Sequence, residues 1–313
     1  MKLRVFILLL IAGFSFFLQG CKDEKGVYEL FSGTLPRIEI PDGEESSYTE
    51  AQTLFFTLKG NVVELEGEVY PIELISDDEE STSYSTSIPL TSDIHVSGLS
   101  YLKAEEKLVL DIAGLERRLV LEKFAHLMDR KANEFAEVEL TSDLSHLSDN
   151  QREMIGLLFQ VADIMEDIYW AQVFPDRDAA LASMMDPNVV RFFKINYGPW
   201  ERLNGNLPYL TGFGPKPAGS GFYPADMTKE EFDALDDPQK TSLYTLITRD
   251  QDGSLKVIPY HEAFSKQVQE AAELLRQASE GISEVPGAKV RSASERRLLP
   301  FRFGMDGHEG KRH

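Results

Sequence analysis

The chain has little cysteine, few histidines and a shortage of basic residues. Its 313 residues include a single cysteine, Cys21, six histidines, and 32 Lys and Arg against 52 Asp and Glu, which gives a formal net charge of −20. One cysteine excludes an intrachain disulfide, and its place near the N-terminus argues against a hydrolase with a nucleophilic cysteine. An acidic surface repels phosphate backbones, so we expect no nucleic-acid partner.

A long apolar run is also missing. The N-terminal run Val5–Leu18 follows a short basic start and is too short for the roughly 20 residues of a membrane span. The small residue Gly20 before Cys21 makes this region resemble the lipobox of a bacterial lipoprotein. We expect a signal peptide over residues 1–20, acylation of Cys21 and anchoring in the lipid bilayer of the cell envelope. Lys22 favours the outer membrane, and the alternative is an ordinary signal peptide with an incidental cysteine.

Two segments follow that differ in composition. Residues 21–50 are rich in Asp, Glu, Gly, Pro and Ser, and they predict a tether. Residues 51–124 contain short apolar segments separated by Gly, Asp and Ser, a spacing that is typical of a small antiparallel sandwich or barrel. His95 has no second histidine at ligand spacing, so we interpret it as structural.

From residue 125 the apolar period becomes helical. We expect a helix over 125–138, and a long helix from a capping box at Ser148 and Gln151 to Trp170, with a core-facing apolar stripe between them. A helix over 176–185, a second capping box at Thr228, a hairpin over 242–260 and a helix over 261–279 follow. The predicted fold class is α+β: a small antiparallel β sandwich or barrel followed by a mainly helical lobe with a β-hairpin.

Several blocks of the second half resemble one family. Residues 127–285 are similar to the N-terminal part of bacterial zinc hydrolases of the dipeptidyl peptidase III family, on five blocks: Phe192–Trp200, Gly214–Pro217, Phe222–Thr228, Ser242–Tyr244 and Val257–His261. The resemblance implies zinc aminopeptidases that release dipeptides from peptide N-termini. It also implies a mostly helical metal-bearing lobe that faces a second lobe across a cleft.

The resemblance directs attention to residues 196–226, which combine many Gly and Pro with aromatics. Long ordered loops of this kind are often functional. We take Tyr197, Trp200 and Arg202 as candidates for peptide contacts in the cleft of the parent enzyme. The alternative is structural, with Trp200 packed in a core and Arg202 paired with an acid.

The zinc motif of this family, H-E-x-x-G-H with a later glutamate, is missing. His308–His313 has a similar histidine spacing but carries Arg where the motif has Gly, and His261 has no second histidine four or five residues on. In the family both motif histidines bind zinc and the glutamate activates water. We therefore expect zinc in full-length relatives but no zinc, no catalytic residue and no hydrolysis in this chain.

Residues 286–313 show no period and are expected to form an unstructured tail in a shifted reading frame. Back-translation of Phe303–Gly310 with a shift of one base allows Leu-Ala-Trp-Met-Asp-Met-Lys, a stretch like one with which family members continue. This leaves two hypotheses, a frameshifted family peptidase that is inactive as this chain, and a non-catalytic surface lipoprotein that binds a peptide, glycan or protein partner.

Overall fold

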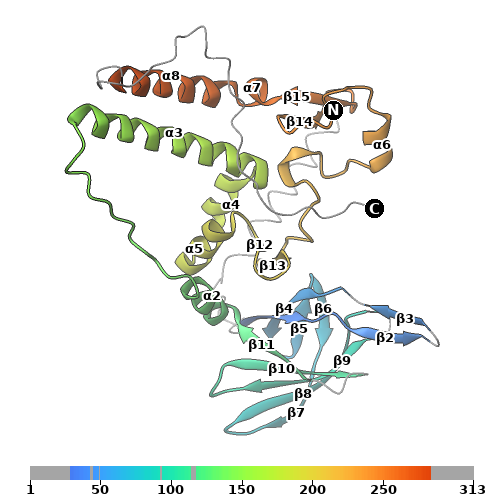
Figure 1. Cartoon of the computed structure of the whole chain (residues 1–313). Helices are drawn as coiled ribbons and strands as arrows, with labels where there is room; N and C mark the ends of the chain where they lie inside the picture. The colour runs from blue at the N-terminus through green and yellow to red at the C-terminus, as the bar shows by residue number, and fades with distance from the viewer. Residues whose placement is uncertain (1–28, 43–44, 49, 92–93, 114–117, 283–313) are drawn as a thin grey trace, which may run out of the picture. The chain divides into compact units, whose positions relative to one another are not determined.

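The computed structural model describes residues 29–42, 45–48, 50–91, 94–113 and 118–282 (Figure 1). The chain divides into two compact units. Unit 1 comprises residues up to Glu139 together with Tyr169–Ile258, and unit 2 comprises Leu140–Ile168 and the residues from Pro259 onward. The expected signal peptide, Cys21 and the expected tail 286–313 lie outside the described residues.

Unit 1 begins with a nine-stranded antiparallel sheet in the order β6-β5-β4-β1-β11-β10-β9-β8-β7. Contacts between β6 and β8 bring its ends together into a near-barrel. The strands are β1 (Glu29–Leu35), β4 (Gln52–Lys59), β5 (Val62–Leu65), β6 (Glu68–Pro71), β7 (Glu73–Asp77), β8 (Ser81–Pro89), β9 (His95–Leu102), β10 (Lys107–Ala113) and β11 (Arg118–Lys123). A separate hairpin joins β2 (Glu39–Asp42) to β3 (Glu45–Tyr48). The predicted α+β fold class is confirmed, and of the two expected forms, a sandwich or a barrel, the sheet takes the near-barrel form.

Strand β1 corrects the expected tether over residues 21–50. It lies between β4 and β11 and pairs with both, with Phe31 opposite Phe56 of β4 and Lys123 of β11. Only Phe31 and Leu35 are large apolar residues that point inward from this strand, with Gly33 between them, so the period-two signal is weak. The strand forms because it supplies the hydrogen bonds that β4 and β11 would otherwise lack.

Alternation along each strand places one apolar set inside the near-barrel. On β4, Leu54 and Phe56 are buried, while Thr53, Phe55 and Thr57 point to the outer face. The interior is filled by large side chains from all parts of the sheet, among them Phe31, Val63, Ile88, Leu99, Leu108, Leu110 and Leu121. His95 is exposed on β9. The outer face of β4 can therefore contact other segments of unit 1.

Helix α2 (Phe124–Asn133) follows β11 directly and contacts β1, β11 and α5 (Pro187–Asn196). Asp186 and Pro187, which follow the helix expected over 176–185, begin α5. The Asp186 carboxylate accepts a hydrogen bond from the Asn188 backbone amide at 2.8 Å, and Pro187 occupies the first turn.

The other elements of unit 1 are α4 (Arg177–Ser183), β12 (Trp200–Glu201), β13 (Leu207–Pro208), η1 (Ser220–Phe222), α6 (Lys229–Ala234), β14 (Thr245–Arg249) and β15 (Leu255–Pro259). Strand β15 ends at the start of unit 2.

Unit 2 contains the first part of α3 (Asp149–Val173), α7 (Tyr260–Ala263) and α8 (Ser265–Ile282). The predicted capping box of α3 is confirmed, since Ser148 and Gln151 exchange backbone-to-side-chain hydrogen bonds at 2.9 and 3.3 Å. The apolar stripe of α3 is only partly core, because Val161 is buried but Leu158 is exposed. The single helix expected over 261–279 is interrupted at Phe264, whose ψ of 34° leaves the helical region. No helix among the described residues is long and apolar enough to cross a membrane.

Candidate functional site

Buried groups at the end of α5 fix the segment Tyr197–Arg202, which contains the three candidate residues. Tyr197 has a left-handed backbone with φ 54°, and its N–H bonds the carbonyls of Lys194 and Phe193. Asn196 is buried, donates its side-chain N–H to the Phe192 carbonyl at 3.0 Å, and accepts the Arg202 backbone N–H at 3.0 Å. The chain from Tyr197 to Arg202 is therefore a held turn, and the following β12–β13 hairpin extends it.

Trp200 is a packing residue of this segment. It is buried, its Nε1 donates to the Gly214 carbonyl at 2.9 Å, and its ring lies edge-to-face against Phe174 and Phe213. Its bond to Gly214 ties β12 to the loop that follows β13. The Lys216 ammonium lies 5.9 Å from the centre of the Trp200 ring. The observed contacts of Trp200 therefore agree with the structural alternative, in which it packs in a core.

Arg202 is exposed and rests on aromatic rings. Its guanidinium carbon lies 5.1 Å from the Tyr197 ring centre and 5.9 Å from that of Tyr169, and the guanidinium donates to the Tyr169 hydroxyl. We expected an acidic partner as the structural alternative. Within the described part of the chain, Arg202 makes no ion pair with a carboxylate.

The sequence analysis missed an ion pair beneath the hairpin. The Lys131 ammonium on α2 lies 2.7 and 2.8 Å from the two Glu201 carboxylate oxygens, and both side chains are largely buried. Nearby, burial and then the Glu201 charge raise the pKa of Tyr209, whose hydroxyl donates to the Gly198 carbonyl at 2.8 Å. The pair joins residues 70 positions apart, so no local pattern could have identified it.

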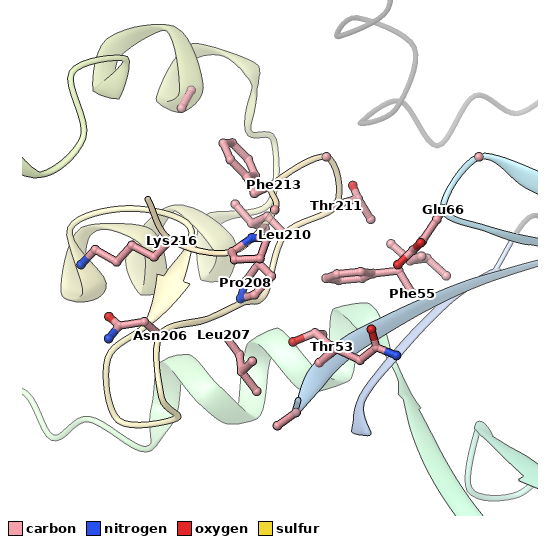
Figure 2. Close-up of a pocket in the computed structure, with 18 of the residues that line it drawn as sticks. Thr53, Phe55, Glu66, Asn206, Leu207, Pro208, Leu210, Thr211, Phe213 and Lys216 are labelled. Atoms are coloured by element: carbon pink, nitrogen blue, oxygen red, sulfur yellow. The ribbon is translucent and has the colours of Figure 1, made fainter. Parts of the chain in front are cut away.

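A groove of about 1150 Å³ lies between the outer face of the near-barrel and the loop after β12 (Figure 2). One wall is formed by outward residues of β1, β4 and β5 and the turn after β5, including Leu30, Thr53, Phe55, Thr57, Glu64 and Glu66. The opposite wall is formed by residues 205–208 and 210–217, with Ala180, Ser183 and Met184 beside them. Figure 2 shows Phe55 facing the loop that carries Leu207, Pro208 and Leu210.

The three candidate residues flank this groove and do not line it. Tyr197, Trp200 and Arg202 precede the lining segment, and Trp200 positions part of that segment through its bond to Gly214. Phe55 and the outer face of β4 were not predicted as site residues. The alternation Thr53-Phe55-Thr57 could have predicted this wall, because a phenylalanine on the outer face of a strand indicates that another segment covers that face.

The described residues contain no group of three or more His, Cys, Asp or Glu side chains placed to hold a metal ion. His261 lies exposed on α7, with its Nε2 3.8 Å from the adjacent Glu262 carboxylate. His308–His313 falls outside the described residues.

Comparison with known proteins finds relatives over about half of the chain. No family model matches it. Nudix hydrolase 3 of Arabidopsis thaliana is 26% identical over an alignment of 218 residues, which covers 50% of this chain and 28% of that protein. The solved dipeptidyl peptidase III of Caldithrix abyssi is 35% identical over 49% of this chain and 31% of its own, with a TM-score of 0.45. That of Corallococcus sp. strain EGB is 28% identical over 50% of this chain and 32% of its own, also with a TM-score of 0.45.

The chain thus spans less than a third of each of these relatives. About half of the chain resembles dipeptidyl peptidase III. The activity named for each relative belongs to its whole length.

Proposed function

We propose that this chain binds short peptides in the groove between β4 and residues 205–217, and that it does not hydrolyse them by itself. The observation that carries the proposal is the position of the groove. One of its walls is formed by the loop that follows Phe192–Trp200 and by the block Gly214–Pro217, and both blocks resemble dipeptidyl peptidase III. A peptide-cleaving family would need such a surface to hold its substrate.

The chemistry of the groove suits a short peptide. Its floor and walls offer apolar side chains, Phe55, Leu207 and Leu210 among them, that can pack against peptide side chains. Its charged groups have opposite signs at separate places, with Glu66 on the near-barrel and Lys216 on the loop (Figure 2). A short peptide is a zwitterion, so Glu66 is suited to its ammonium group and Lys216 to its carboxylate.

Hydrolysis by this family needs the H-E-x-x-G-H zinc site, and the 313 residues contain no such motif. We therefore propose that this chain is a peptide-binding lobe of the dipeptidyl peptidase III type. Zinc would supply the activated water in full-length relatives. Inspecting the gene beyond codon 280 tests the shifted frame, because an alternate frame encoding H-E-x-x-G-H supports it and its absence contradicts it.

The binding proposal is tested by calorimetric titration of the 313-residue chain with tri-alanine and tri-leucine. Phe55→Ala removes the apolar wall of the groove, and we expect it to weaken tri-leucine binding about tenfold. Phe159→Ala is the matched control, because Phe159 is exposed on α3 and outside the groove. Equal affinities of Phe55→Ala and the unchanged chain would contradict the proposed site.

We propose further that Cys21 is acylated and anchors the chain to a bilayer of the cell envelope, most simply the outer membrane. The support is the lone cysteine after Gly20 and the apolar run before it. Labelling cells with a palmitate analogue should mark the chain, and Cys21→Ser should abolish the label. Persistent label in Cys21→Ser would contradict the anchor.

A second candidate function rests on a different surface. Val69 on β6 and Leu74 and Ile75 on β7 are exposed by 58%, 61% and 68%. Exposed apolar residues at a sheet end suit a protein partner, so a non-catalytic lipoprotein that binds a protein through this face is the alternative. Leu74→Ser with Ile75→Ser would abolish such binding and leave peptide affinity unchanged.

A further inference from the structure

Two cations near the groove, Arg202 and Lys216, each lie over an aromatic ring. Lys216 and Arg202 make no ion pair with any carboxylate of the described residues, although the chain carries 52 Asp and Glu. Other cations of unit 1 do pair, such as Lys131 with Glu201 and Arg249 with Glu231. Because their charges are not neutralised by a carboxylate of the described residues, Arg202 and Lys216 can receive an external anion.

Both cations are held in place by the same short segment. Arg202 is fixed at its backbone by the buried Asn196 amide and at its guanidinium by the Tyr169 hydroxyl and the Tyr197 ring. Lys216 lies over the Trp200 ring, and the bond from Trp200 to Gly214 fixes the backbone two residues before Lys216. Pre-positioned side chains lose little rotamer freedom when a ligand binds.

The two charges also affect one another. Burial lowers the pKa of the Lys216 ammonium, and the positive charge of Arg202 lowers it further. Like charges at close range are unfavourable until an anion lies between them. Cation–ring contacts steady each side chain, and Arg202 keeps N–H groups beyond the one that donates to the Tyr169 hydroxyl.

We propose that Arg202 and Lys216 together bind the C-terminal carboxylate of a peptide that occupies the groove. This inference rests on the proposed peptide-binding function and adds the group that orients the ligand. Lys216 belongs to the groove wall and Arg202 lies outside the groove. The peptide carboxylate would therefore lie at the end of the groove that Lys216 lines. Arg202 offers a planar fork of donors that matches a carboxylate, and Lys216 adds a point charge.

The test uses the intrinsic fluorescence of the full chain, whose two tryptophans lie near the two cations: Trp200 lies under Lys216, and Trp170 packs against Tyr197. The titrants are tri-alanine, tri-alanine amide and inorganic phosphate. We expect the free acid to bind at least tenfold more tightly than the amide, because only the acid carries the anion. Arg202→Gln and Lys216→Gln should each weaken acid binding at least fivefold and leave amide binding unchanged.

Lys256→Gln is the matched control, since it removes one exposed positive charge from β15 and should change nothing. Arg202→Lys keeps the charge and should restore part of the acid preference. Equal binding of acid and amide overturns the carboxylate site while leaving peptide binding intact. Phosphate that binds more tightly than tri-alanine also overturns it, and failure of both peptides to bind overturns the proposed function.

Discussion

Lys131 and Glu201 form a two-pronged ion pair inside unit 1, with the ammonium 2.7 and 2.8 Å from the two carboxylate oxygens and side-chain exposures of only 15% and 12%. The pair connects α2, which follows the near-barrel, to β12, which begins the groove loop. The Lys131 ammonium also lies 5.8 Å from the centre of the Phe192 ring. The position of the groove loop therefore depends on a charge carried by α2.

Lys131→Met should lower the free energy of unfolding by about 3 kcal/mol, because it leaves the buried Glu201 carboxylate without its counter-charge. Urea denaturation measures the change. Arg118→Gln is the control, since it breaks an exposed pair with Asp111 that is worth no more than about 1 kcal/mol. If the two variants lost similar free energies of unfolding, the buried pair would contribute no more to stability than the exposed one.

Gly221 marks a close approach between η1 and the end of α3. A Cβ atom at this position would lie 2.6 Å from the Ala171 carbonyl oxygen and 2.9 Å from that of Gln172. Gly221→Ala should therefore cost about 1–3 kcal/mol of stability, because backbone oxygens cannot rotate away.

Gly214→Ala is the matched control for Gly221→Ala. A Cβ atom there meets nothing within 4 Å, so the free energy of unfolding should stay the same or rise by up to about 1 kcal/mol. Thermal melts of both variants measure the difference. If Gly221→Ala is as stable as Gly214→Ala, then η1 does not approach the end of α3 as closely as described.

Tyr209 predicts a dependence of stability on alkaline pH. Burial and then the Glu201 charge raise its folded pKa above the unfolded value of 10.0, so the stability it contributes is fully present below pH 10. That contribution is lost as the pH rises through the folded pKa, by about 1.4 kcal/mol per pH unit.

The stability advantage of the unchanged chain over Tyr209→Phe should therefore shrink between about pH 10 and 11.5. Chemical denaturation of both chains across this range measures it, and the comparison cancels the titration of the other tyrosines and lysines. A constant difference would mean that the Tyr209 hydroxyl titrates alike in the folded and unfolded chain.

Local patterns predicted most elements, and long-range pairing accounts for the errors. The capping boxes at Ser148 and Thr228 depend on residues three apart, so the sequence alone located them. Strand β1 depends on pairing with β11, about 90 residues later, and its few inward apolar residues are hidden in acidic and polar sequence. An extended segment of this kind becomes recognisable only beside its partners.

The candidate site divides in the same way. The aromatic and glycine-rich composition of 196–226 predicted an ordered loop, and Trp200 and Arg202 do belong to one cluster with Tyr197. The wall formed by Phe55 was missed because β4 and the loop are about 150 residues apart. Only the folded chain brings the two together.

The most direct test of peptide binding in the groove is photo-crosslinking of the 313-residue chain with a tripeptide that carries a benzophenone side chain at its central position. Mass spectrometry would map the attachment sites and show whether the peptide is cleaved. We predict attachment to residues 205–217 and to Gln52–Thr57 of β4, suppressed by excess tri-leucine, with the peptide intact. Attachment at Val69, Leu74 and Ile75 instead, or cleavage of the peptide, would contradict the account.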